Sequence, residues 1–381
     1  MKPTFRVGYH KFHRRQLFNF QLNRWYSLGY TSFEDCVEAG KHVNTFADWK
    51  REMILLAEKS VSDGLLLRAA FYYRAAEFYL LADVPEKEFL YDKFSALFYQ
   101  AIQSDDVKRY KVPYNQTFLP AMKLSAKGEK RGTVVVHGGF DSFIEEFYSM
   151  MRFFSDHGYD VVGFEGPGQG AARRKYGLAF DYRWEKPVRT VLDYFDLDDV
   201  TLLGISMGGW FCLRAAAFDS RIKRVIATGH AFDYFQMAPL PIQWFAKFFL
   251  QFEVFSNWSA NLKMKYMPRS SQAYWEITHS MYITKTNTAL AALKQMLQLN
   301  EENLHAEMIK QDVLVFAGKD DHFIPFKMHR KQLNVLVNAK TVSDRVFTKE
   351  EHAQNHCQTG NIGLALDIMF KWIEEKQQYQ I

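Results

Sequence analysis

Residues 1 to about 105 have the apolar pattern of packed helices. Small and aromatic side chains fill residues 69–79, and residues 89–102 repeat apolar side chains at spacings of three and four, as one face of a helix does. Pro85 stands between these runs, and proline cannot continue a helix. The pattern predicts an N-terminal helical domain over residues 1–105, in which the two runs form an antiparallel hairpin docked on the rest of the chain.

From about residue 107 the apolar pattern changes to that of strands. Two alternating runs, 107–113 and 116–123, predict an antiparallel hairpin. Short β-branched runs then alternate with helical stretches, and this order predicts an α/β fold whose mostly parallel sheet has helices on both faces. These runs are 133–136, 160–164, 200–203, 224–228, 313–316 and 345–347.

The regular spacing of strands is interrupted once. About eighty residues separate residue 228 from residue 313, and a structureless loop of that length is uncommon in a compact domain. Aromatic residues between 244 and 255 fall at helical spacings. We therefore expect a helical cap at about 232–310, inserted over the carboxyl edge of the sheet in a second domain that covers residues 106–381.

The composition is that of a globular chain. Its 381 residues are 48% apolar and 24% charged, which permits a large core. Aromatic residues make up 16% and include 34 phenylalanines, and two explanations stay open: a packed core, or a wide apolar substrate cavity. No run of about 18 uncharged apolar residues occurs, so no membrane span is expected.

Net charge and cysteine content indicate which binding partners and which cellular compartment to expect. The net charge of +5 is spread along the chain and does not indicate a nucleic-acid partner. Cys36, Cys212 and Cys357 form no paired motif, and the first residues lack the apolar core of a signal peptide, so a reduced, cytoplasmic setting is expected. The glycine-rich residues 166–170 lack the Lys-Ser/Thr of a phosphate loop, no metal-ligand spacing is found, and no cofactor is expected.

Gly204-Ile205-Ser206-Met207-Gly208 is the strongest chemical signal. It lies between a predicted strand and the helix-forming run 210–218, which is the context of a nucleophile elbow. Such a bend is so tight that the residues two positions away from the serine must be glycines. Ser206 is therefore predicted to be a nucleophile at the edge of the sheet.

A serine nucleophile needs a base, and the base needs an acid that fixes its tautomer. In this chain order the acid follows a late strand, and the spacing Gly-x-x-Asp-x-x-Ile-Pro favours Asp321 over Asp320, with Asp233 as a weaker candidate. The base should follow the last strand, where His356 is favoured over His352.

Negative charge that develops on a carbonyl oxygen should meet two backbone N–H groups. One is expected from Met207, which follows the nucleophile. The other is expected from the glycine-rich segment after the strand 133–136, with Phe140 or Gly139 as the donor. Cys357 is a rival nucleophile, but it lies in a loop without an elbow.

Together these motifs resemble a known group. They are similar to α/β-hydrolases related to acylaminoacyl peptidases, and more closely to the 2,6-dihydroxypseudooxynicotine hydrolase-like group with its fungal pigment-pathway relatives. The similarity runs from about residue 107 to 378, and the late His-Cys-Gln supports His356. The motifs that carry the resemblance are 137–142, 165–170, 204–209, 318–325 and 356–358.

The resemblance implies an α/β-hydrolase fold and a Ser–Asp–His mechanism on a small-molecule acyl, peptide or aromatic ketone substrate. Some members cleave a carbon–carbon bond next to a ketone, and Asp141 matches the place of a further carboxylate in those enzymes, with Asp where they have Glu. The first hypothesis is a serine hydrolase of ester, amide or peptide-like bonds. A non-catalytic interaction scaffold is the alternative of another class, and a homodimer formed through the N-terminal helices is compatible with the sequence.

Overall fold

The structure is a computed structural model that describes residues 4–378. Strands form one sheet in the spatial order β1-β2-β4-β3-β5-β6-β7-β8. β1 pairs antiparallel with β2, β2 pairs antiparallel with β4, and the remaining pairs are parallel, so the predicted mostly parallel sheet is confirmed. The strands are β1 (Val107–Tyr114), β2 (Thr117–Leu124), β3 (Gly132–His137), β4 (Tyr159–Phe164), β5 (Val200–Ile205), β6 (Ile222–Thr228), β7 (Asp312–Gly318) and β8 (Thr341–Phe347).

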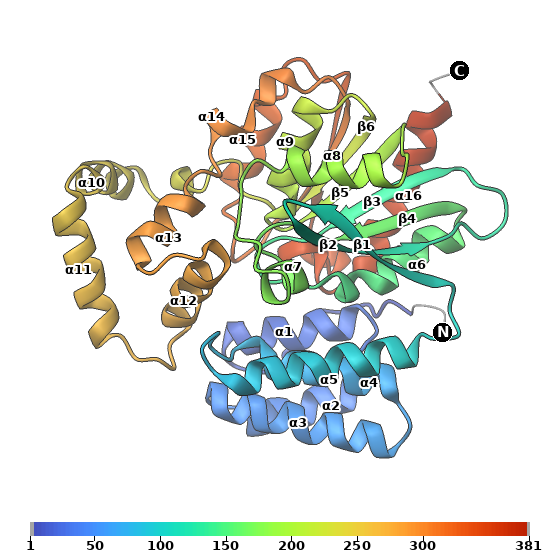
Figure 1. Ribbon diagram of the computed structural model, residues 1–381. Coiled ribbons are helices and arrows are strands. Elements are labelled where there is room, and N and C mark those ends of the chain that lie inside the picture. The colour runs from blue at the N-terminus through green and yellow to red at the C-terminus, as the bar shows by residue number, and fades with distance from the viewer. Residues whose placement is uncertain (1–3, 379–381) are drawn as a thin grey trace.

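Helices cover both faces of the sheet (Figure 1). Successive side chains of a strand point to opposite faces, so Val134 and Val136 join one apolar cluster and Val135 joins the other. All residues of β5 are buried, as expected for a strand that is covered on both sides. The face of Val135 carries α8 (Glu185–Tyr194), α9 (Gly208–Phe218) and α15 (Lys327–Val335), and the opposite face carries α6 (Tyr148–Asp156) and α16 (Ile362–Gln378).

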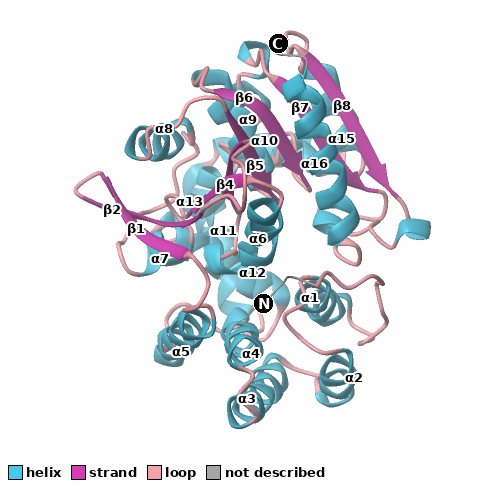
Figure 2. Ribbon diagram, turned by 90° about the vertical axis from the view of Figure 1, so that its right-hand side faces the viewer, coloured by secondary structure: helices cyan, strands magenta, loops and turns pink. Residues whose placement is uncertain are grey.

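The N-terminal helices form a layer beside the sheet (Figures 1 and 2). The predicted hairpin is formed by α4 and α5. Pro85 occupies the first turn of α5, where a backbone N–H would have no acceptor within the helix, so proline breaks no hydrogen bond there. The apolar core runs without a break from these helices to the sheet, so a domain boundary near residue 105 stays a prediction. The helices are α1 (Gln16–Ser27), α2 (Phe33–His42), α3 (Phe46–Ser62), α4 (Leu66–Phe78) and α5 (Pro85–Ala101).

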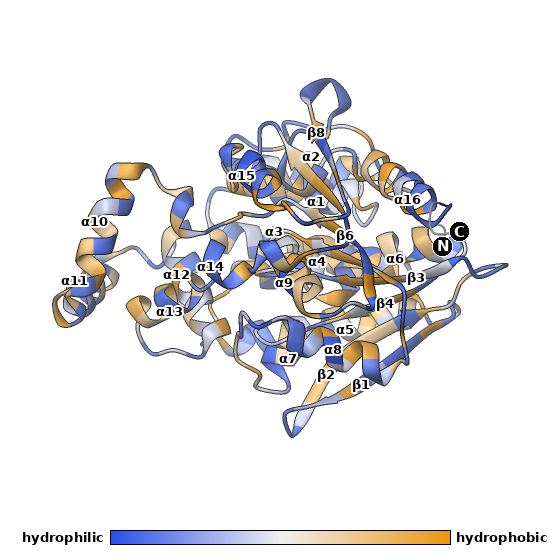
Figure 3. Ribbon diagram, turned by 90° about the horizontal axis from the view of Figure 1, so that it is seen from above, coloured by the Kyte–Doolittle hydropathy of each residue, from blue (hydrophilic) through white to orange (hydrophobic). Residues whose placement is uncertain are grey.

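The predicted helical cap lies between β6 and β7. Its α12 is tied to α4, because Trp275 Nε1 donates a hydrogen bond to the Phe78 carbonyl oxygen at 3.1 Å. By contrast, α10 and α11 project away from the sheet (Figures 1 and 3). The cap consists of η2 (Phe235–Met237), α10 (Leu240–Gln251), α11 (Glu253–Tyr266), α12 (Gln272–Thr284), α13 (Ala289–Met296), α14 (Glu301–Leu304) and η3 (Ala306–Met308).

Shorter helical turns connect the strands at the edge where the site lies. They are η1 (Ile144–Phe147), α7 (Gly170–Arg174), η4 (Lys349–Glu351) and η5 (His356–Gln358). Over residues 4–378, none of the helices has both the length and the apolar character that a membrane crossing requires.

Candidate active site

Ser206 stands at the bend between β5 and α9. Its φ of 60° lies in the left-handed region that serine rarely adopts. The Ser206 N–H donates to the Thr228 carbonyl oxygen at 2.9 Å and holds the bend against β6. A Cβ at Gly204 would lie 2.0 Å from the Gly208 carbonyl oxygen, and one at Gly208 would lie 2.6 Å from the Gly138 carbonyl oxygen. Both positions therefore require glycine, and the bend directs the serine hydroxyl into a cavity.

Three side chains from distant parts of the chain form a continuous hydrogen-bonded series. Ser206 Oγ lies 2.9 Å from His356 Nε2, and His356 Nδ1 lies 2.7 Å from Asp321 Oδ2. The carboxylate accepts the Nδ1 proton, which leaves Nε2 free to accept the serine proton. β5, β7 and β8 end at the same edge of the sheet, and the turns that follow them supply the three groups.

The Asp321 carboxylate is fixed by backbone groups as well as by the histidine. Its Oδ1 accepts hydrogen bonds from the N–H groups of Phe323 at 2.9 Å and Ile324 at 3.0 Å, and its side chain is 4% exposed. The other two acid candidates lie elsewhere. Asp320 is exposed to solvent, and Asp233 accepts hydrogen bonds from two backbone N–H groups of the cap. The structure thus brings only Asp321, among these three, to His356.

The two neighbouring candidates in the loop after β8 differ: His352 lies outside the series, whereas Cys357 interacts with His356. His352 is exposed and ends η4 with a φ of 59°. Cys357 is half-buried, lines the cavity beside His356, and its thiol points to the Thr228 carbonyl oxygen at 4.0 Å. The thiol has no counterpart of the elbow that presents the serine hydroxyl.

Burial and pairing set the protonation of this site. Burial alone would lower the pKa of His356, but the Asp321 carboxylate outweighs it and holds the pKa well above the ordinary 6.5. Burial would likewise raise the pKa of Asp321, whereas the attraction of His356 and the hydrogen bonds lower it. Burial and the nearby His356 lower the pKa of His322 to about 4, so the His322 ring is neutral near pH 7.

Replacing Asp321 with asparagine is expected to lower kcat about 10⁴-fold, because the imidazole loses both its tautomer and the partner of its positive charge. Protonated His356 cannot accept the serine proton, so activity falls as the pH drops through the pKa of His356. In the wild type this limb of the kcat/KM profile lies above pH 6.5, and in D321N it moves to lower pH. The profile is measured with a p-nitrophenyl ester. The exposed D320N is the matched control, and a D321N profile that keeps the wild-type limb and rate would contradict the assignment.

The segments that carry Phe140 and Met207 meet beside Ser206 and line the same cavity. A Cβ at Gly139 would lie only 2.7 Å from the Met207 nitrogen, so the two segments touch. Within residues 4–378 the N–H groups of Met207 and Phe140 donate no hydrogen bond to the protein, which leaves both available to an oxygen of a bound molecule. Gln169 braces this segment, because its Nε2 donates to the carbonyl oxygens of Gly138 at 2.7 Å and Gly139 at 3.1 Å.

The cap contacts the same segment. His279 of α12 donates from Nε2 to the Phe140 carbonyl oxygen at 3.1 Å. Burial lowers the pKa of His279 to about 4, so its ring is neutral near pH 7 and donates as the Nε2–H tautomer. The ring of Trp275 stacks on His279 at 5.2 Å between centroids. The position of Phe140 therefore depends on the cap as well as on β3.

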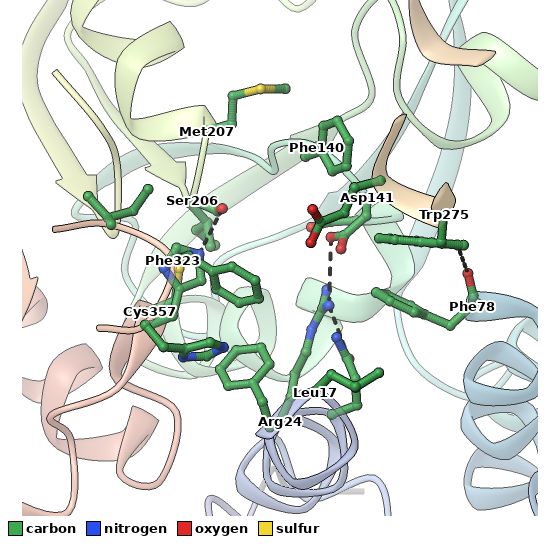
Figure 4. A pocket seen from close by; sticks show the side chains of 18 of the residues that line it. Leu17, Arg24, Phe78, Phe140, Asp141, Ser206, Met207, Trp275, Phe323 and Cys357 are labelled. Atoms are coloured by element: carbon green, nitrogen blue, oxygen red, sulfur yellow. Dashed lines mark hydrogen bonds and ion pairs between the residues drawn. The ribbon is translucent and has the colours of Figure 1, made fainter. Parts of the chain in front are cut away.

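A cavity of about 540 Å³ opens above Ser206. The sheet edge forms its floor, α1 one wall and the cap helices α12 and α13 another, and Figure 4 shows Ser206 and Arg24 on opposite sides of the space. The lining is mostly apolar, which is typical of small-molecule sites. Its aromatic members are Phe20, Phe78, Tyr79, Phe140, Phe147, Tyr234, Trp275 and Phe323.

The polar end of the cavity is an arginine–carboxylate cluster. Arg24 of α1 forms a short hydrogen-bonded ion pair with Glu146 and lies 3.6 Å from the Asp141 carboxylate. Arg74 of α4 donates to Glu146 at 2.7 Å and to the Asp141 carbonyl oxygen at 2.6 Å. Two N-terminal helices thus hold the segment that follows the Phe140 loop.

The sequence-based interpretation missed Arg24, Glu146 and Gln169. Asn19, Gln21 and Asn23 around Arg24 are buried as well, but their burial follows from how α1 docks and is not visible in the sequence of the helix. No local pattern marks Glu146 as the partner of Arg24. Over the described residues no group of histidine, cysteine and carboxylate side chains is suited to hold a metal ion.

The chain is similar to known α/β-hydrolases in sequence and in structure. The model of a family described by the alpha/beta hydrolase fold matches residues 134–342, more than half of the chain. Hydrolase acrC of Aspergillus aculeatus is 28% identical, and the match covers 85% of this chain and 84% of the relative. The 20-hydroxy-prefusarin hydrolase FUS2 of Gibberella moniliformis is also 28% identical over 82% of this chain and 84% of the relative.

Among solved structures, the crystal structure of a 2,6-dihydroxy-pseudo-oxynicotine hydrolase superposes with a TM-score of 0.65 at 20% identity. The superposition covers 92% of this chain and 94% of that one. A likeness at this identity establishes a shared fold, which here includes the N-terminal helices.

Proposed function

The chain belongs to the alpha/beta hydrolase fold family, and from this premise we propose that it is a serine hydrolase that cleaves an acyl bond through a Ser206–His356–Asp321 triad. The observation that carries the proposal is the series of two hydrogen bonds, 2.9 Å and 2.7 Å long, that starts at a serine hydroxyl on a strained bend. Membership in a hydrolase family favours an enzyme over the interaction scaffold.

The proposed reaction has two halves. Ser206 Oγ attacks the carbonyl carbon while His356 takes its proton, and the N–H groups of Met207 and Phe140 bind the oxyanion. His356 then gives the proton to the leaving group, and an acyl-enzyme remains. A water molecule, activated by the same histidine, releases the acid and restores the serine.

Hydrolysis of a carbon–carbon bond next to a ketone is the second candidate reaction. Ser206 would attack the ketone, and the carbon–carbon bond would break to leave an acyl-enzyme and a carbanion. Where the leaving fragment has a carbonyl of its own this carbanion is an enolate, and His356 protonates it; water then hydrolyses the acyl-enzyme. An enolate oxygen needs a positive partner, and the Arg24 guanidinium, which pairs with Glu146 and Asp141, lies in the same cavity. The position of Arg24 in the cavity is the observation that favours the alternative.

The cytoplasmic setting of the enzyme remains a prediction.

The acyl-enzyme is tested by rapid mixing with p-nitrophenyl butyrate. We expect a burst that approaches one p-nitrophenolate per active site if deacylation is the slower step, and intact-mass measurement of the acid-quenched enzyme should show one added butyryl group. Pretreatment with a fluorophosphonate should remove both signals. A burst of p-nitrophenolate without a covalent butyryl group on the quenched enzyme would overturn the double-displacement mechanism.

A further inference from the structure

The α10–α11 hairpin, residues 240–266, leaves most of its large apolar side chains exposed. No residue of α10 is buried, and Trp244 is 81% exposed. Among its polar residues, Gln243 is half-buried and donates to the Ala238 carbonyl oxygen at 2.7 Å, whereas Lys247 and Gln251 are exposed. A surface helix normally turns its apolar side to the core.

The second helix repeats this arrangement. Ser256 is the one buried residue among those of α11, and its hydroxyl donates to the Phe249 carbonyl oxygen at 2.5 Å. Phe255, Trp258 and Leu262 are exposed. Their spacings of three and four place them in one stripe along the helix, which is the pattern of a helix that packs against other helices in a bundle.

The exposed apolar surface is large. Eleven exposed large apolar side chains lie between residues 240 and 266, and Figure 3 shows hydrophobic segments on α10, at the end of the molecule remote from the sheet. At about 100 Å² each the eleven expose roughly 1,000 Å², against 150–250 Å² for a whole aromatic side chain. The largest patch of a typical monomer is about 300–600 Å², whereas one partner in a stable complex buries about 800 Å².

The distribution of charge distinguishes a protein partner from a membrane surface. A helix that lies in a membrane interface presents a wide, strongly charged face to water and is rich in lysine and arginine. α10 has no such face, because Lys247 is its single charged residue. On α11, Glu253, Lys263 and Lys265 are exposed, so a few charges of both signs flank the apolar stripe, as they do at the rim of a protein interface.

We propose that the α10–α11 hairpin is a dimerisation surface whose partner is the same hairpin of a second copy of this chain. A patch that is apolar along both helices is complementary to itself, which is what a twofold interface requires. Two hairpins placed face to face form a four-helix bundle that covers the stripes of both copies. α11 packs against α13, and Glu253 forms a 3.0 Å ion pair with Lys294 of that helix, so the bundle adjoins the helices that line the cavity.

The test is sedimentation equilibrium of the full chain between 0.1 and about 100 μM, a range that spans the Kd values of weak and tight dimers. The double variant F248E/W258E places two charges in the proposed bundle, and we expect it to weaken dimerisation about 100-fold or more. F89E is the matched control, because Phe89 is a similarly exposed phenylalanine on α5 of the N-terminal helices. Far-UV circular dichroism checks that each variant is folded.

A dimeric wild type and a dimeric F89E, together with a monomeric F248E/W258E, support the proposal. A wild type that stays monomeric at the highest concentration overturns it, as does a dimer that F89E disrupts and F248E/W258E does not. Co-sedimentation of a monomeric wild type with phosphatidylglycerol vesicles also overturns it, in favour of a membrane surface. Should the double variant misfold, bismaleimide cross-linking of N261C on α11 replaces it: covalent dimers with N261C and none with K59C on α3 support the proposal, and the reverse rejects it.

Discussion

Replacing Ser206 with alanine is expected to lower kcat for p-nitrophenyl ester hydrolysis about 10⁶-fold, the loss that follows removal of the nucleophile from a serine triad. The substitution deletes only Oγ, which lies 2.9 Å from His356 Nε2. Alanine carries the same backbone into the same bend, so the cavity and the oxyanion donors should persist. The residual rate over water then measures what those donors supply without covalent attack.

Cys357→Ala is the control for this experiment, because its thiol lies in the same cavity beside His356. We expect C357A to keep hydrolysis within a few fold of the wild type, since the hydrogen bonds from Ser206 to His356 and from His356 to Asp321 do not involve the thiol. A full loss of activity in C357A with activity retained in S206A would move the nucleophile to the cysteine. Thermal unfolding of both variants shows whether either substitution has disturbed the fold.

Replacing His356 with alanine is expected to lower kcat to nearly the same extent as S206A, about 10⁶-fold. Without the imidazole, Ser206 has no base within reach, and the Asp321 carboxylate is left buried without its partner. Because the three groups act as a unit, the double variant S206A/H356A should be no slower than either single variant. The measurement is kcat for all three proteins at one pH.

His352→Ala is the matched control in the same loop. Its ring is exposed, and we expect unchanged kcat. A large loss in H352A, or substantial activity in H356A, would contradict the choice of base. If the loss of kcat in the double variant equalled the product of the two single losses, Ser206 and His356 would act independently, which would contradict a triad.

The strands were predictable where local composition carries the information. β5 was expected to end at residue 203 and the next helix to begin at 210, whereas β5 runs to Ile205 and α9 begins at Gly208. The glycines at the elbow have low propensity for both strand and helix, so the sequence pattern does not mark where β5 ends and α9 begins. β8 was recognised only over 345–347, because its first residues, from Thr341 on, are polar or exposed at the sheet edge.

The triad candidates could be found because each follows the end of a strand in a fixed chain order. The cluster around Arg24 could not be found in that way. Arg24 and Glu146 are 122 residues apart in the chain, and they meet only because α1 docks across the sheet edge. Such a pairing depends on the orientation of a whole helix, which no local pattern in α1 records.

The aromatic residues show a similar limit. A packed core and a wide cavity were both compatible with 34 phenylalanines, and the structure uses them for both purposes. Phe18 stacks on Trp49 inside the N-terminal layer, whereas Phe20, two residues later, lines the cavity. Composition alone cannot show which phenylalanines pack in the core and which line the cavity, because this depends on which face of α1 meets the sheet.

The account is tested most directly by identifying the residue that a fluorophosphonate probe modifies. The wild type is labelled with one equivalent, digested with a protease and mapped by tandem mass spectrometry. The account predicts a single adduct on the peptide that contains Ser206, with fragment ions that assign it to that residue. An adduct on any other residue, or none in an enzyme that hydrolyses esters, would contradict the claim that the Ser206 hydroxyl is the nucleophile.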